Sequence, residues 1–291
     1  MTSIIRSQTI QLGSHFETIQ ETITSTEQFS NLAAICCFDP RNKSITFKTE
    51  KIHPLETKPN ATPVLLLFSN PHPLSVASGM FLSEPRSRSF WVRLFDCECM
   101  QPSDILKRSI SNWDDETIGI LTHNLLDQTF SDKISIYMDC LESLPTNQYS
   151  DLKKIFAGKE GREFRSTALQ IPGMAALADL SAKNNIKSWI VFSAEAFRYI
   201  CNDRTLAKNA PDRIIEALDK YYAEQDDRSF WSELSDLKVV IDDLEINVYL
   251  ALIARRKNWK NNKGKYYFTA MLDKIFSQIE RQEGRGDDGL K

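Results

Sequence analysis

Apolar and polar residues follow one another along this chain in runs that predict strands separated by helices. A nearly unbroken apolar run at 64–68 is typical of a strand whose two faces are both buried under helices. Two further strands are expected at 133–139 and 189–192, with helical patterns between all three. This order predicts an α/β fold, a three-layer sandwich in which helices flank a central, mainly parallel sheet.

The apolar spacing indicates further elements on both sides of these strands. The expected helices are 14–37 with a break near Ser25, 86–98, 102–112, 114–127, 175–185, 194–200, 210–224 and 266–280. The remaining strands are expected at 44–51, 237–241 and 246–253. Because no repeat or clear linker divides the chain, we expect one domain over 1–291, with an N-terminal helical extension at 1–60 and a flexible tail at 282–291.

The composition is that of an ordinary globular protein. Of the 291 residues, 42% are hydrophobic, which is sufficient for a substantial core. No stretch reaches the roughly 18–20 apolar residues of a membrane helix, and 1–7 lacks the pattern of a secretion signal. We therefore expect an intracellular protein of the cytoplasm or nucleoid that does not bind membranes. Six irregularly spaced cysteines, with no second ligand pair to join Cys97 and Cys99, predict no metal and no cofactor.

The charge is unevenly distributed. A net charge of −3 argues against a uniformly basic surface for nucleic acid. Segment 255–265 nevertheless contains six cations and no acid: Arg255, Arg256, Lys257, Lys260, Lys263 and Lys265. Such a segment is able to neutralise phosphates, and Trp259 within it is able to fill the gap left by a displaced base. A solvated lysine-rich loop is the alternative interpretation.

The stretch after the first buried strand contains the best candidate for a site. Ligands in open α/β sheets bind at the carboxyl ends of the strands, and this is where Asn70 falls. Pro71 and Pro73 restrict the backbone around His72, so the turn is able to hold a side chain or a water in position. The alternative is structural, with Asn70 capping the turn and His72 packing beside it.

The residues that follow this corner resemble a known motif. Asn70 and Pro71 after a buried strand, then Gly79, Phe81, Pro85 and the pair Phe90–Trp91, resemble the first motif of the uracil-DNA glycosylase superfamily. The similarity is closest to the mismatch-specific uracil/thymine glycosylase branch. It covers about 30 residues of the chain.

Three later segments agree with this resemblance in order. The strand "ISIYMDC" leads to Thr146 and to Asp151–Leu152, and "SWIVFSAEAFRYI" is similar to the family's strand, short turn and helix. The stretch "VYLALIARRKNWKNNKGKYYFTAMLDKIF" is similar to its last strand, DNA-inserting loop and C-terminal helix. The resemblance implies a uracil-DNA glycosylase-like fold and a monomeric, monofunctional DNA glycosylase, a hydrolase of base-excision repair. Its partner would be duplex or single-stranded DNA that contains an altered base.

The resemblance also implies roles for single residues. A base is excised only after it is flipped out of the stack, and Phe81 would lie against the flipped base. Asn70 would position the attacking water, since the reaction builds charge on the sugar and on the departing base. Ser69 and Ser193 are assigned to base binding, and Arg86 and Arg88 to DNA together with 255–265, with an intramolecular salt bridge as the alternative for one of these two arginines. His72 and Asp139 are assigned to catalysis from their positions after the first and at the end of the second strand. The alternatives are that His72 fills space and that Asp139 is solvated or capping.

Two departures from the family pattern leave the substrate open. His72 replaces the small residue that usually follows Asn-Pro, and the small-polar motif expected after the last strand is replaced by "IARRKNW". Uracil, mismatched thymine or a modified base therefore remain candidates. Two other functions are also considered: a catalytically inactive DNA-binding relative, and a small-molecule nucleotide-processing enzyme, against which the absence of a glycine-rich phosphate loop argues.

Overall fold

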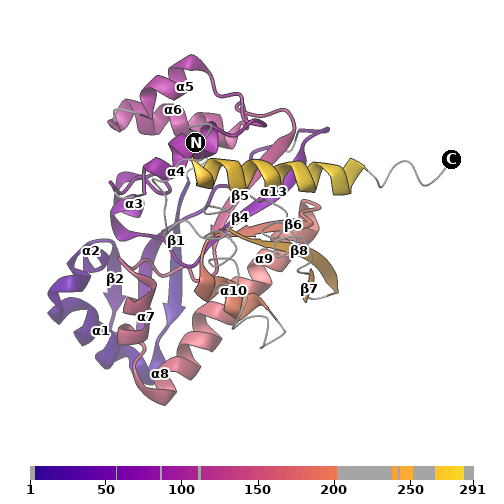
Figure 1. Ribbon diagram of the computed structural model, residues 1–291. Coiled ribbons are helices and arrows are strands. Elements are labelled where there is room, and N and C mark those ends of the chain that lie inside the picture. Colours follow the sequence, from indigo (N-terminus) through magenta and orange to yellow (C-terminus); the bar gives the residue numbers. More distant parts are fainter. Residues whose placement is uncertain are drawn as a thin grey trace.

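The main sheet contains five strands. The computed structural model describes residues 4–56, 58–85, 87–110, 113–201, 238–241, 243–251 and 266–284. In this part of the chain the strand order is β5-β4-β6-β8-β7 (Figure 1). All neighbouring pairs are parallel except β7 with β8. The strands are β4 (Thr62–Phe68), β5 (Ile134–Cys140), β6 (Ser188–Val191), β7 (Lys238–Ile241) and β8 (Leu244–Leu250).

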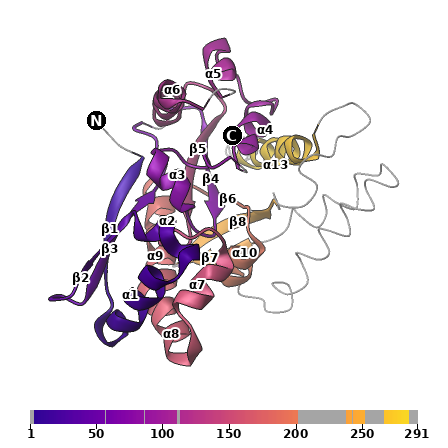
Figure 2. The same cartoon turned by 90° about the vertical axis from the view of Figure 1, so that its left-hand side faces the viewer.

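Helices flank this sheet on both faces (Figures 1 and 2). On one side lie α4 (Ser89–Phe95), α5 (Asp104–Ser109), α6 (Asp115–Leu126) and α13 (Tyr267–Gly284). On the other side lie α9 (Ile171–Lys183) and α10 (Ala194–Ile200). The predicted α/β fold with a mainly parallel central sheet is confirmed. None of the helices in the described ranges combines the length and apolar character that a membrane crossing requires.

The N-terminal region differs from its prediction. It contains an antiparallel sheet of order β1-β3-β2, formed by β1 (Ile5–Gln11), β2 (Cys36–Asp39) and β3 (Ser44–Glu50). Its helical turns are η1 (Gly13–His15), α1 (Phe16–Ser25), η2 (Glu27–Phe29) and α2 (Ser30–Ala33). The helical extension expected at 1–60 is therefore corrected to a mixed region. β1 escaped the sequence analysis because only one of its side chains is buried, so its apolar pattern is weak.

A second hydrophobic core joins this region to the main sheet. Phe47 of β3 and Ile19 of α1 belong to the same buried cluster as Leu152 and Phe156. Leu152 lies on α7 (Tyr149–Ile155), which is followed by α8 (Gly158–Arg165) and a π-helical segment, η3 (Ser166–Gln170). The sequence analysis assigned no element to these three segments. The N-terminal sheet therefore packs on the connection between β5 and β6.

The chain then passes from the small sheet along the edge of the large one. Ile52 forms an antiparallel bridge with Met138 of β5, with N–O distances of 2.9 and 2.8 Å. This bridge places the end of β3 beside the carboxyl end of β5. The short helix α3 (Pro73–Ser78) follows β4 in the same neighbourhood.

Two expectations concern segments near the C-terminus. The helix expected at 210–224 lies outside the described residues. The tail expected to begin at 282 is helical as far as Gly284, where α13 ends. Residues 285–291 lie outside the described part of the chain.

Candidate functional site

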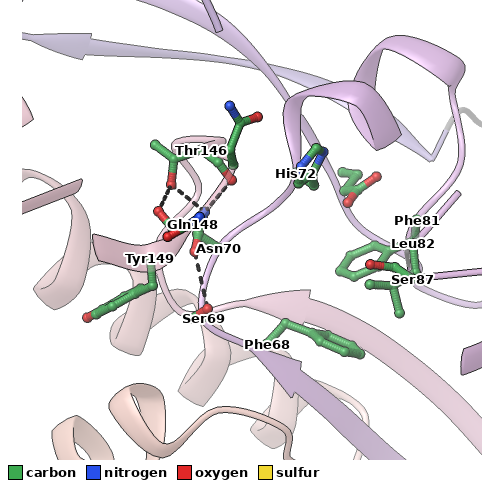
Figure 3. A pocket seen from close by; sticks show the side chains of 12 residues that line it. Phe68, Ser69, Asn70, His72, Phe81, Leu82, Ser87, Thr146, Gln148 and Tyr149 are labelled. Atoms are coloured by element: carbon green, nitrogen blue, oxygen red, sulfur yellow. Dashed lines mark hydrogen bonds between the residues drawn. The ribbon is translucent and has the colours of Figure 1, made fainter. Parts of the chain in front are cut away.

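A cavity of about 190 Å³ lies at the carboxyl ends of β4 and β5. Strands β5, β4, β6 and β8 take the doubly wound order 2-1-3-4, whose topological switch point lies between β4 and β6. The cavity lies at the end of β4 and extends toward the segment after β5. The cavity is lined by Glu50, Phe68, Ser69, Asn70, His72, Phe81, Leu82, Ser87, Thr146, Asn147, Gln148 and Tyr149 (Figure 3).

Asn70 is fixed at the end of β4 by bonds to both ends of its amide. Its Nδ2 donates to Thr146 Oγ1 at 2.8 Å and to Pro71 O at 3.0 Å. Its Oδ1 accepts from Ser69 Oγ at 3.1 Å, as Figure 3 shows. Both N–H groups are therefore used, while the carbonyl oxygen retains one lone pair for a further donor.

Thr146 connects this amide to the neighbouring strand. Its Oγ1 donates to Gln148 O at 2.8 Å, and its backbone N–H donates to Pro71 O at 3.0 Å. The loops after β4 and β5 are thus bonded to each other through one buried threonine. These bonds fix the orientation of the Asn70 amide beside the cavity.

The corner after Asn70 forms a capped helix. Pro73 opens α3, and the Nδ1 atom of His72 accepts from Leu74 N at 3.2 Å. Accepting at Nδ1 places the proton of the neutral ring on Nε2. α3 ends at Gly79, whose φ of 85° is readily adopted by glycine. His72 therefore combines the expected structural role with a place on the cavity wall.

Aromatic side chains form the opposite wall. Phe81 is only 1% exposed and lies 5.1 Å from Phe68 between ring centroids. The Nε1 atom of Trp91 donates to Phe81 O at 2.8 Å. Leu82 follows with a φ of 54°, a left-handed conformation that is costly for leucine. Phe81 is thus a core residue that also lines the cavity, and its place against a flipped base stays a prediction.

Glu50 is the lining residue that the sequence analysis missed. Its side chain is 1% exposed, and its Oε2 has no hydrogen-bond partner among the described residues. Burial raises the pKa of Glu50 well above its ordinary value. Along β3 it shares a face with Thr46 and with the exposed Lys48, so the strand pattern assigns it to solvent.

A buried polar network around Glu142 holds the lining residue Tyr149. Arg165 binds Glu142 through two nitrogens, and Tyr149 Oη donates to Glu142 Oε1 at 2.9 Å. Gln170 Nε2 donates to the same oxygen at 3.0 Å. Burial and the neighbouring Glu142 carboxylate raise the pKa of Tyr149, so its hydroxyl remains protonated. The network fixes the loop between β5 and α7.

Several expected site residues lie elsewhere. Asp139 accepts from Lys51 at 3.0 Å, lies 3.2 Å from His53 Nε2, and does not line the cavity. Ser193 caps α10 by accepting from Ala196 N at 3.1 Å, and Arg88 Nε donates to Ser83 O at 2.6 Å. The structure thus gives these three residues structural partners, and none of them lines the cavity. Their expected roles stay predictions. Among the described residues no group of three His, Cys, Asp or Glu side chains has the arrangement of a metal site.

No known protein family matches this chain. No curated protein is similar to it in sequence either. The function of this chain is therefore inferred from the cavity and from the residues that line it. Of the residues expected at the site, the cavity brings together Ser69, Asn70, His72 and Phe81.

Most of the expected DNA-binding residues lie outside the part of the chain that the structure describes. Arg86 lies outside the described residues. The same holds for the whole basic segment, namely Arg255, Arg256, Lys257, Trp259, Lys260, Lys263 and Lys265.

Proposed function

We propose that this protein is a monofunctional DNA glycosylase that hydrolyses the N-glycosidic bond of an altered pyrimidine. The observation that supports this best is Asn70, whose amide is bonded at both ends and opens on a cavity with an aromatic wall. The likeness of its motifs to the uracil-DNA glycosylase superfamily points the same way, and a fold of that type belongs to the proposal.

The geometry of Asn70 suits the positioning of water. Because its N–H groups are occupied by Thr146 and Pro71, the amide offers only a carbonyl lone pair. That lone pair accepts one hydrogen of a water molecule and directs its oxygen toward C1′ of the sugar. The water oxygen bonds to C1′ as the C1′–N bond breaks with its electrons on the base, and the proton that the water loses passes through solvent to the departing base. An amide cannot act as a strong base, so turnover is slow.

The size and walls of the cavity suit one flipped base. Its volume of about 190 Å³ is below the roughly 300–1,000 Å³ of pockets for drug-sized ligands. Phe81 and Phe68 provide the apolar surface against which a ring packs. DNA would be held by the basic segment 255–265, with affinity that falls steeply as salt rises.

An excision assay tests this proposal. Oligonucleotides containing one uracil, one mismatched thymine or one modified pyrimidine are incubated with the protein and cleaved at abasic sites with alkali. We expect cleavage of at least one substrate, and a loss of about 100-fold or more in the single-turnover rate for Asn70→Ala. Asn60→Ala is the matched control, because Asn60 is exposed and precedes the opposite end of β4.

The outcomes separate the competing functions. Salt-sensitive DNA binding without cleavage of any substrate would identify a catalytically inactive DNA-binding relative. Cleavage that is unchanged in Asn70→Ala would remove the proposed site. Binding of nucleotides without any binding of DNA would favour a small-molecule enzyme.

A further inference from the structure

We propose that the carboxyl group of Glu50 recognises the ligand of this cavity, an uncharged ring whose edge carries a hydrogen-bond acceptor beside a donor. The inference deepens the proposed function, on which it rests, by naming the group that reads the base. It assigns a binding role to the N-terminal sheet, which the motif resemblance does not cover.

The first argument is the unsatisfied oxygen. Oε2 of Glu50 is buried and has no partner in the described part of the chain, although Glu50 lines an open volume of about 190 Å³. Leaving a buried carboxyl oxygen unpaired costs free energy, so this oxygen calls for a partner such as a ligand, a water or an ion. The missing partner therefore belongs to the occupant of the cavity.

The second argument is the protonation state. Within the described part of the chain no cation pairs with Glu50 Oε2: His72 Nδ1 accepts from Leu74 N, and Lys51 pairs with Asp139. The Tyr149 hydroxyl bonds to Glu142, and burial together with Asp139 and Glu50 raises the pKa of the Cys140 thiol. Burial alone raises the pKa of Glu50, which favours the protonated form. A protonated carboxyl has one O–H donor beside one acceptor oxygen.

The third argument is complementarity. A donor beside an acceptor pairs with the reverse pattern on a planar ring in two parallel hydrogen bonds. The N–H and C=O of uracil or thymine form such an edge, and so do the ring nitrogen and amino group of cytosine. A ligand edge that carries only acceptors fits less well, because the acceptor oxygen of the carboxyl would stay unpaired.

The experiment measures binding of free bases to the full chain by calorimetry between pH 5 and 9. Uracil and cytosine are the two candidate edges, and 3-methyluracil removes the donor from the first. We expect one of the two bases to bind, and its affinity to fall as pH rises through the pKa of Glu50. Glu50→Leu should weaken it about tenfold, corresponding to about 1.4 kcal/mol.

Glu50→Gln provides the decisive comparison, because its amide keeps a donor and an acceptor without a proton to lose. We expect it to retain binding and to show no pH dependence. Glu163→Gln is the control, since its side chain is 66% exposed on α8. Melting temperatures confirm that each variant is folded.

Equal affinity in Glu50→Leu and the wild type would overturn the inference, as would binding of neither base. If uracil is the ligand, equal binding of 3-methyluracil would also overturn it. Glu50-dependent binding without excision activity would contradict the proposed function alone. Excision with no effect of Glu50→Leu on base binding would contradict this inference alone.

Discussion

Thr146 holds the side-chain amide of Asn70 in one orientation. Its hydroxyl accepts from Asn70 Nδ2 at 2.8 Å and donates to Gln148 O at 2.8 Å. A hydroxyl is able to do both at once, and no other small side chain except serine shares this property. Thr146 is therefore a positioning residue, because it acts on the reaction through Asn70.

Thr146→Val is expected to lower the single-turnover excision rate about 10- to 100-fold, with little change in DNA affinity. The amide of Asn70 loses its anchor, whereas the surfaces that contact DNA are unchanged. Thr146→Ser restores the hydroxyl and most of the rate. A loss of activity that serine does not restore would show that the threonine methyl group matters instead.

The raised pKa of Glu50 predicts that the free energy of unfolding depends on pH. Its pKa is raised in the folded protein by burial, so the folded state holds a proton that the unfolded chain releases above the ordinary value. Stability contributed by Glu50 is present below that ordinary pKa and is lost as pH rises toward the raised pKa. Glu50→Gln removes this loss.

We therefore expect Glu50→Gln and the wild type to differ little in unfolding free energy at pH 4. At pH 8 the variant should be more stable by on the order of 1 kcal/mol or more. Urea denaturation at the two pH values measures the difference. In the exposed Glu163→Gln control the unfolding free energy should differ from the wild type by the same amount at both pH values. If Glu50→Gln is instead less stable than the wild type at pH 8, Glu50 is ionised in a favourable contact.

At the scale of elements, the packing of α9 against Leu141 determines where the loop after β5 lies. A Cβ added at Gly173 of α9 would lie 1.9 Å from the carbonyl oxygen of Leu141. The π-helical η3 immediately before α9 brings Gln170 to within 3.0 Å of Glu142. A π segment inside a helix frequently marks a functional position. Here it aligns the helix with the loop that contains Thr146.

Gly173→Ala is expected to destabilise the protein by about 1–3 kcal/mol, because the contact is with backbone that has to move. Gly119→Ala on α6 is the matched control. Nothing lies within 4 Å of its added Cβ, so a gain of about 0.5–1 kcal/mol is expected from helix propensity. Urea denaturation measures the unfolding free energy of both variants. If Gly173→Ala were as stable as Gly119→Ala, α9 would have moved away from Leu141 at no cost.

At the scale of the whole molecule, α7 packs in the hydrophobic core of the small sheet. Phe47 of the small sheet and Leu152 of α7 belong to one cluster, and the loop that contains Thr146 precedes that helix. The small sheet is therefore part of the support of the cavity. It also supplies Glu50 as a lining residue.

Phe47→Ala is expected to cost about 3–5 kcal/mol of stability. If the protein unfolds as one unit, tryptophan fluorescence and far-ultraviolet circular dichroism should report the same lowered transition. Ile105→Ala is the control, since Ile105 is 64% exposed. Two separate transitions in Phe47→Ala would show that the small sheet unfolds independently of the site.

Local patterns were sufficient for the main elements and for one half of the site. The apolar run 64–68 and the prolines around His72 are features of contiguous residues, and they predicted a buried strand that ends in a rigid corner. Helices α7 and α8 were missed because their positions follow from packing on the N-terminal sheet. Asp139 was expected at the site because it lies near the end of β5. A strand end indicates an edge of the sheet but not the neighbour of each side chain, and here Asp139 pairs with Lys51.

The sequence by itself determined the alternation of strands and helices, and with it the place of Asn70 at the carboxyl end of β4. The order of the elements and the period of the apolar residues are local properties of the chain. Because the strands are parallel, their carboxyl ends lie at the same edge of the sheet. Only the tertiary structure decided that Glu50 is buried in the cavity and that Asp139 is paired with Lys51. Strand periodicity states which face a side chain is on, whereas the burial of that face depends on segments distant in the chain.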